Sequence, residues 1–123
     1  MICAPAIISP PPRRLYLGRA ADVFALVDAE DYEWATYWLW GITPDKHGRK
    51  FYATRCTRRR REREAQIKVY LHKAILERSG LKPPSPRHTI GDHRDGDSLN
   101  DQRGNLRWAT PSMNARNRRK VWA

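Results

Sequence analysis

The chain has 123 residues, which is enough for one folded domain. Its composition is 40% hydrophobic with five Trp and five Tyr residues, which argues against a disordered chain, and the lack of any apolar run of about 18 residues excludes a transmembrane helix. The net charge of +11, from 24 Lys and Arg against 13 Asp and Glu residues, is typical of proteins that bind a polyanion, most often nucleic acid.

The first residues and the two cysteines indicate in which cellular compartment the protein is expected. Residues 1–13 are expected to form a flexible arm, because their apolar start lacks the positive charges of a signal peptide and runs into Pro10–Pro12. Cys3 and Cys56 lie far apart and form no CxxC pair, so we expect neither zinc nor a disulfide framework. This cysteine usage fits a reducing, cytoplasmic setting.

Residues 14–87 begin with strand and helix signals in turn. Leu15–Leu17 and Val23–Val27 are β-rich runs separated by a turn that contains glycine, and they predict a pair of strands. Asp28 is a suitable N-cap for a short helix that continues to about Tyr37. We therefore expect a helix directly after the first hairpin.

A second group of strands is expected further along the chain. Trp38–Ile42 and Phe51–Cys56 flank the turn residues Pro44–Gly48 and predict a hairpin, to which Ala65–Leu71 adds a third strand. The run His72–Ser79 predicts a helix that ends at the glycine following it. Residues 14–87 are thus expected to form an N-terminal antiparallel sheet with short helices, in contact with DNA.

A cluster of arginines lies inside the predicted N-terminal sheet. It comprises Arg58, Arg59, Arg60, Arg61 and Arg63, with Glu62 among them and Glu64 directly after them. A solvated loop and a contact to nucleic-acid phosphates are both open for such a run, and the charge of the whole chain favours the second. The glutamates dilute the positive field, so we expect contacts to the phosphate backbone and not to base edges.

The last segment, residues 88–123, predicts a strand, a loop, a second strand and a helix in that order. Thr89–His93 and Leu106–Ala109 are the expected strands. Thr110 is a good N-cap and Pro111 a good first helical residue, so a helix should begin there. A helix that crosses this hairpin lets Asn114 point back toward the first strand.

This segment resembles the core of HNH endonucleases, the ββα-metal fold, and is closest to their phage and intron-homing branch. The residues that carry the resemblance are Asp92-His93, Asp95-Gly96, Asn100, Asn105-Leu106-Arg107-Trp108, Thr110, Asn114 and Asn117. Weaker similarity extends upstream to Phe24–Asp28 and to Leu71-His72-Lys73. The third letter of the family motif is often His, whereas this chain has Asn114, a change that many homing-type members share. The resemblance implies an α+β fold and metal-dependent hydrolysis of double-stranded DNA.

The residue types suit phosphodiester hydrolysis in their own right. A neutral His93 can deprotonate a water molecule, and the side-chain oxygen of Asn105 can fix the tautomer of its ring. Asp92 and Asn114 offer hard oxygen ligands, which suit Mg²⁺, with Mn²⁺ as a substitute. Asn117 competes with Asn114 as the ligand, since residues three apart share one helix face. Each residue also has a purely structural alternative, as a turn cap, a packed histidine or a loop hydrogen-bond partner.

Further arginines and a lysine around this segment are expected to grip the DNA backbone: Arg94, Arg107, Arg116, Arg118, Arg119 and Lys120. Arg107 has the alternative of pairing with an acidic neighbour. Four aromatic residues upstream are expected to lie in the core rather than to stack on nucleic-acid bases: Trp34, Trp38, Trp40 and Tyr52.

The expected partner is double-stranded DNA, with no membrane and no small-molecule cofactor, for a monomer or homodimer. The rival functions are a non-catalytic DNA-binding protein of the same fold and an RNA-binding or RNA-cleaving protein.

Overall fold

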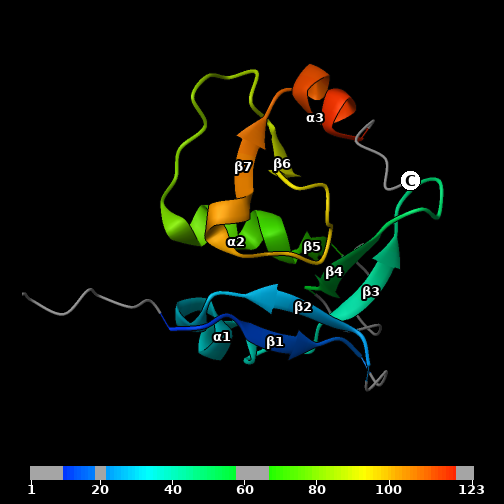
Figure 1. Ribbon diagram of the computed structural model, residues 1–123, viewed down its shortest axis with the longest axis vertical. Helices are drawn as coiled ribbons and strands as arrows, with labels where there is room; N and C mark the ends of the chain where they lie inside the picture. Colours follow the sequence, from blue (N-terminus) through cyan, green and yellow to red (C-terminus); the bar gives the residue numbers. More distant parts are fainter. Residues whose placement is uncertain (1–9, 19–21, 58–66, 119–123) are drawn as a thin grey trace, which may run out of the picture.

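The computed structural model describes residues 10–18, 22–57 and 67–118. Over these residues the chain has a mixed α+β fold of short antiparallel sheets and three α-helices (Figure 1). The elements are β1 (Arg13–Tyr16), β2 (Phe24–Val27), α1 (Ala29–Ala35), β3 (Gly41–Pro44), β4 (Phe51–Cys56), β5 (Lys68–Tyr70), α2 (Leu71–Ser79), β6 (Ile90–His93), the 3₁₀ turn η1 (Arg103–Asn105), β7 (Leu106–Ala109) and α3 (Pro111–Arg118).

The strands form three separate antiparallel sheets, β1–β2, β3–β4–β5 and β6–β7. The predicted α+β class with antiparallel pairing is confirmed at this level. The expected single N-terminal sheet is wrong, because β1–β2 and β3–β4–β5 do not pair with each other. Helix α1 lies between the two sheets along the chain.

The first hairpin and its helix follow the sequence with shifted ends. Strand β1 already begins at Arg13, inside the predicted arm, whereas residues 1–9 of that arm lie outside the described residues. Helix α1 ends at Ala35 and not at Tyr37, and the Ala35 carbonyl accepts hydrogen bonds from the Trp38 amide (3.2 Å) and from the Trp40 indole (2.8 Å). These donors satisfy a carbonyl that the end of the helix leaves without a partner within the helix.

The later elements follow the order that the sequence predicts, although β3 spans Gly41–Pro44 and not the predicted Trp38–Ile42. The β3–β4 hairpin, the added strand β5 and helix α2 are all present, and α2 ends at Gly80 with a left-handed backbone (φ 78°). Only glycine adopts that conformation without strain, which explains the end of the helix. Among the described residues no helix is long and apolar enough to cross a membrane.

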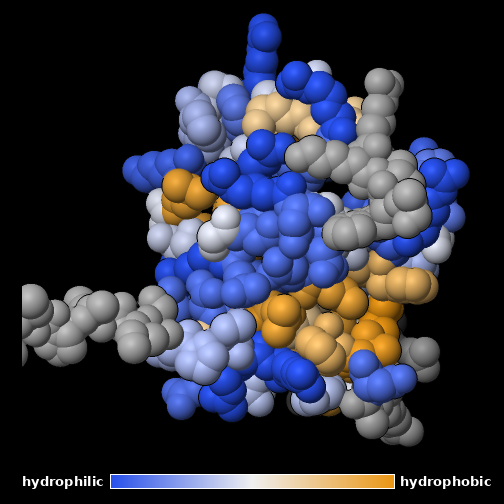
Figure 2. Space-filling view, in the orientation of Figure 1, coloured by the Kyte–Doolittle hydropathy of each residue, from blue (hydrophilic) through white to orange (hydrophobic). Residues whose placement is uncertain are grey.

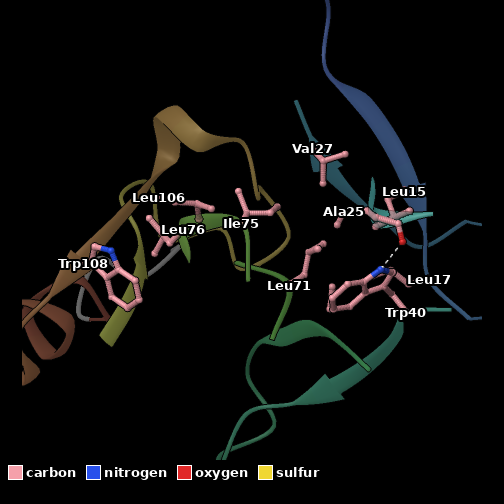
Figure 3. Packing of buried hydrophobic residues seen from close by; sticks show 12 residues of the cluster. Leu15, Leu17, Ala25, Val27, Trp40, Leu71, Ile75, Leu76, Leu106 and Trp108 are labelled. Atoms are coloured by element: carbon pink, nitrogen blue, oxygen red, sulfur yellow. Dashed lines mark hydrogen bonds between the residues drawn. The ribbon is translucent and has the colours of Figure 1, made fainter. Parts of the chain in front are cut away.

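Helix α2 lies between the two halves of the molecule, with β6, β7 and α3 on one side and the β1–β2 hairpin and α1 on the other (Figure 1). Its Leu71 and Ile75 are fully buried and Leu76 nearly so. Figure 3 shows Leu71 facing the N-terminal residues of the core, while Leu76 lies beside Leu106 of β7. One hydrophobic cluster therefore runs across the boundary expected between residues 87 and 88.

The four aromatic residues expected in the core divide between interior and surface. Trp40 is buried and Trp34 packs against the core, whereas Trp38 is 37% exposed. The guanidinium of Arg55 stacks over the Trp38 ring, 4.3 Å from its centroid. Tyr52 is half-buried, and its ring lies 5.6 Å from that of His72. The core expectation is therefore wrong for Trp38.

A buried carboxylate joins three elements at the base of the molecule. Asp31 of α1 has no exposed surface. Arg103 of η1 donates two hydrogen bonds to it, at 2.9 and 2.7 Å, and Arg78 of α2 donates a third at 3.2 Å. A carboxylate taken out of water needs such charged donors, so Asp31 stabilises the position of α1 against the C-terminal elements.

Candidate functional site

Strands β6 and β7, the loop between them and helix α3 build the site. The strands pair antiparallel, with Asp92 opposite Arg107 and His93 opposite Leu106. The loop turns at Gly96, whose φ is 79°, as its Asp-Gly-Asp sequence predicts. Helix α3 begins as predicted, because the Thr110 hydroxyl accepts a hydrogen bond from the Met113 amide (3.1 Å).

The side chains of Asp92 and His93 point to opposite sides of β6, as neighbours in a strand do. Asp92 faces α3, where Asn117 contacts it. His93 faces α2, and its ring lies 4.7 Å from the ring of His72. Both are buried, Asp92 at 4% and His93 at 6% exposure, so each depends on its protein partners for hydrogen bonding.

The carboxylate of Asp92 is engaged by two donors. The Arg107 guanidinium lies 2.9 Å from Oδ2, which makes Arg107 the ion-pair partner of Asp92. The Asn117 amide nitrogen lies 3.1 and 3.2 Å from the two carboxylate oxygens and also donates to the His93 carbonyl. The amide oxygen of Asn117 is buried and has no hydrogen-bond partner among the described residues. The side chain whose nitrogen contacts the carboxylate thus also carries an oxygen without a partner.

Asn114, the expected neighbour of Asp92, lies elsewhere. It lines a cavity of about 410 Å³ together with Thr89, Ile90 and Gly91 at the start of β6. Residues three apart on helix α3 lie almost one turn apart along its axis, so Asn114 and Asn117 face different points of the hairpin. Asn114 therefore lies beside the beginning of β6, and Asn117 reaches its end.

Asn105 also differs from expectation, because its side chain binds the loop and not the His93 ring. Its oxygen accepts the Asp95 amide (3.0 Å), and its nitrogen donates to the Asp95 carboxylate (2.9 Å) and to the Asn100 carbonyl (2.8 Å). Asn105 thereby holds the two ends of the loop together. The group that contacts the His93 ring is the carboxylate of Asp101.

Asp101 and His93 form a buried pair. The His93 Nε2 atom lies 2.6 Å from Asp101 Oδ1. The backbone of Asp101 is fixed from a distance, because its amide donates to the Leu26 carbonyl of β2 (2.8 Å) and the Leu26 amide donates to the Leu99 carbonyl (2.8 Å). Burial raises the pKa of the Asp101 carboxyl, and the hydrogen bond to His93 opposes this effect. The first hairpin thus positions the partner of a histidine in the last one.

His72 of α2 completes this group from the side of the cavity. It is 9% exposed and lines the same cavity as Asn114 and Tyr52. Gly91 lets the ring approach β6, since a Cβ atom there would lie 2.8 Å from Cδ2 of His72. Burial, followed by the charge of His93, lowers the pKa of His72 to about 3. The imidazole is therefore neutral in the folded protein across the physiological range.

Acid should destabilise the protein through His72. Its unfolded imidazole binds a proton near pH 6.5, whereas the folded one does so only near pH 3. Stability from this group is complete above 6.5 and falls as the pH falls, because the unfolded state binds the proton first. Thermal melting between about pH 7.5 and 4 should show a smaller dependence for His72→Gln than for wild type. The exposed His47→Gln should keep the wild-type slope; an unchanged slope in His72→Gln would assign the acid effect to other groups.

The structure describes only some of the basic residues that are expected to contact DNA. Arg94 and Arg116 are exposed, whereas Arg107 is paired with Asp92. The expected contacts Arg58, Arg59, Arg60, Arg61, Arg119 and Lys120 lie outside the described residues, as does the side chain of Arg118. Two cations that the sequence did not single out, Lys46 and Lys73, line the cavity beside His72.

Two contacts of the site were missed from the sequence. Asp101 stands in a loop rich in Asn and Asp, where nothing distinguishes it from its neighbours. The resemblance gave His72 a helix position but no role. The contacts of Asp101 and His72 arise from the packing of elements that are distant along the chain, and a single sequence does not show this packing. Comparison of the chain with protein-family models, curated proteins and solved structures finds no match.

Proposed function

We propose that this protein is a metal-dependent DNA endonuclease of the HNH class, phage or homing type. The observation that supports it best is the pair of groups on the two sides of β6. His93 is backed by Asp101 on one side, and Asp92 lies against Asn117 on the other. They stand in the strand, loop, strand and helix order typical of the ββα-metal fold.

In this proposal His93 is the general base. The Asp101 carboxylate accepts a hydrogen bond from the Nε2–H group, which leaves the lone pair on Nδ1 to take a proton from water. The same carboxylate stabilises the imidazolium that forms. His72 lies beside the ring and lines a cavity together with Lys46 and Lys73, whose positive charges suit a phosphate group.

The oxygen atoms beside α3 fit a divalent cation. The Asp92 carboxylate and the unpartnered amide oxygen of Asn117 are hard donors of the kind Mg²⁺ prefers, with Mn²⁺ as a substitute. When bound, such an ion neutralises charge on the phosphate and on the leaving oxygen. Arg107 already supplies one positive charge to Asp92. Asn114, from the cavity at the start of β6, remains the second candidate ligand.

Charge on the surface supports DNA as the substrate. The net charge of the chain is +11. Figure 2 shows hydrophilic residues over most of the upper half of the face, the half that holds β6, β7 and α3 in Figure 1. Exposed Arg94 and Arg116 belong to this half and are free to contact phosphates.

A non-catalytic DNA-binding protein is the second candidate, and one observation favours it. The Asp92 carboxylate is occupied by Arg107 and Asn117, and His93 is buried, which is also what a purely structural polar cluster would show. The two candidates agree on DNA binding and differ in chemistry. Cleavage therefore distinguishes them.

Purified protein should convert supercoiled plasmid into the nicked form in the presence of Mg²⁺ or Mn²⁺. One site cuts one strand at a time, so nicked DNA should precede linear DNA on a gel. EDTA should abolish the reaction, because the proposed chemistry needs the cation. Cleavage that survives EDTA contradicts the metal-dependent mechanism. Tight DNA binding without cleavage under any metal supports the second candidate, and preferential binding or cutting of structured RNA supports the RNA alternative.

A further inference from the structure

A second group of potential metal ligands lies on the opposite side of β6 from Asp92. His72, His93 and Asp101 come from α2, β6 and the following loop, and all three are buried. Each offers one donor atom, and these atoms lie within 4.8 Å of one another. Within the described part of the chain, this is the one group of three or more His, Cys, Asp or Glu donors gathered so closely.

The carboxylate of this group has an oxygen without a partner. Asp101 is 1% exposed, and its Oδ1 atom pairs with His93. Its Oδ2 atom is buried and has no hydrogen-bond partner among the described residues. A buried carboxylate oxygen is stable only with a donor or a cation beside it. The unpartnered oxygen therefore points to a missing positive ligand.

The backbone keeps space for the two imidazoles. His72 lies against β6 only because residue 91 is glycine, since a Cβ atom would come 2.8 Å from Cδ2 and 3.3 Å from Nε2 of the ring. Any larger residue would push His72 away from His93. Glycine at this position thus serves the approach of the two rings, whose centroids are 4.7 Å apart.

The donor types select a class of ion. Two imidazole nitrogens and one carboxylate suit a borderline first-row cation such as Zn²⁺, in contrast to the oxygen donors of Asp92 and Asn117. Bonds of about 2.1 Å place ligand atoms roughly 3.4 Å apart, so the widest pair here must close by on the order of 1 Å. Rotation of the His72 side chain, which borders the cavity, can supply that movement. Three protein ligands leave a further coordination position open.

We propose that His72, His93 and Asp101 bind a Zn²⁺-class ion, and that this ion inhibits cleavage by occupying the imidazole of His93. The binding site stands on the geometry alone. The inhibition rests on the proposed nuclease function, in which the same imidazole must be free to accept a proton. No zinc was expected from the sequence because the two cysteines form no CxxC pair. The proposed ligands are instead two histidines and an aspartate from separate elements.

Cobalt provides the direct test, because Co²⁺ takes the geometry of zinc sites and absorbs visible light when nitrogen ligands surround it. Titration of the full chain should give a saturable visible band with one ion per chain. His72→Gln should weaken Co²⁺ binding by about 100-fold or more, because it removes a ligand. The matched controls are His47→Gln and His88→Gln, which change histidines outside the group and should leave the band intact. Zn²⁺ should displace Co²⁺ and remove the band.

Two outcomes would overturn the site: no visible band in the folded protein, or a band that His72→Gln leaves unchanged. Circular dichroism shows whether His72→Gln is folded. If it is not, Gly91→Ala is the second variant, since it keeps every ligand and displaces the His72 ring. It should weaken Co²⁺ binding as well, and unchanged binding would contradict the proposal.

Cleavage separates this inference from the proposed function. In wild type, Zn²⁺ at the concentration that displaces Co²⁺ should suppress nicking supported by Mg²⁺, and a zinc chelator should restore it. Cobalt binding without any nicking would sustain the site and contradict the nuclease. Nicking without cobalt binding would sustain the nuclease function and contradict the metal site. Full nicking with Zn²⁺ bound would overturn the inhibition.

Discussion

Replacement of His93 by Ala is expected to slow plasmid nicking by about 10²- to 10⁴-fold, because the reaction loses its general base. Ground-state contacts with DNA do not involve this buried ring, so DNA affinity should stay within a factor of about two. Single-turnover nicking and a binding titration on the same substrate measure the two effects.

Asp101→Asn provides the matched comparison for His93→Ala. It keeps the size of the side chain and its acceptor oxygen, but it removes the negative charge that supports the imidazolium. Nicking should slow, by less than in His93→Ala. Thermal melting at neutral pH checks that the variant keeps its fold. Asn105→Ala should act through the loop, lowering stability and nicking together.

A full nicking rate in His93→Ala would show that another group is the base. His72 would then be the first candidate, because it lines the cavity beside His93. His88, the other histidine near the segment, has its Nδ1 atom 2.7 Å from the Ser85 hydroxyl and is less available. Nicking that falls only because the variant unfolds is recognised by circular dichroism.

Asp31→Ala is expected to lower the free energy of unfolding by about 3 kcal/mol, because it removes one partner of a buried ion pair. Asp31 is fully buried and accepts hydrogen bonds from Arg103 and Arg78. Its loss leaves both guanidinium groups without their main anion. The side chains of Arg103 and Arg78 are 28% and 39% exposed, so water can solvate part of their charge. The expected loss of stability is therefore at the lower end of the range for breaking a buried ion pair. Urea denaturation measures the difference.

Glu30→Ala is the matched control for Asp31→Ala. Glu30 also pairs with Arg103, at 3.4 Å, but its side chain is 62% exposed. Solvent screens such a pair, so the free energy of unfolding should change by less than about 0.5 kcal/mol. Equal effects of the two substitutions would show that burial of Asp31 adds nothing to the pair. The two variants differ by one position on the same helix.

The elements that the sequence predicted well are those set by local backbone chemistry. Gly80 and Gly96 adopt the left-handed conformations that end a helix and form a turn. Thr110 caps α3, and the short β-rich runs form antiparallel strands. In each case the residues that decide the conformation lie within a few positions of one another. At the end of helix α1, the Ala35 carbonyl also accepts a hydrogen bond from the Trp40 indole, further along the chain.

The sequence by itself determined the order of the elements, the α+β class and the position of Asp92 and His93 on one strand. The tertiary structure decided which side chains meet them. Asn117 and not Asn114 contacts Asp92 because of where α3 crosses the hairpin. Asp101 and not Asn105 contacts His93, since β2 holds the loop through the backbone of Leu26. Such contacts depend on how distant segments pack, and residue spacing along a single chain carries no record of that packing.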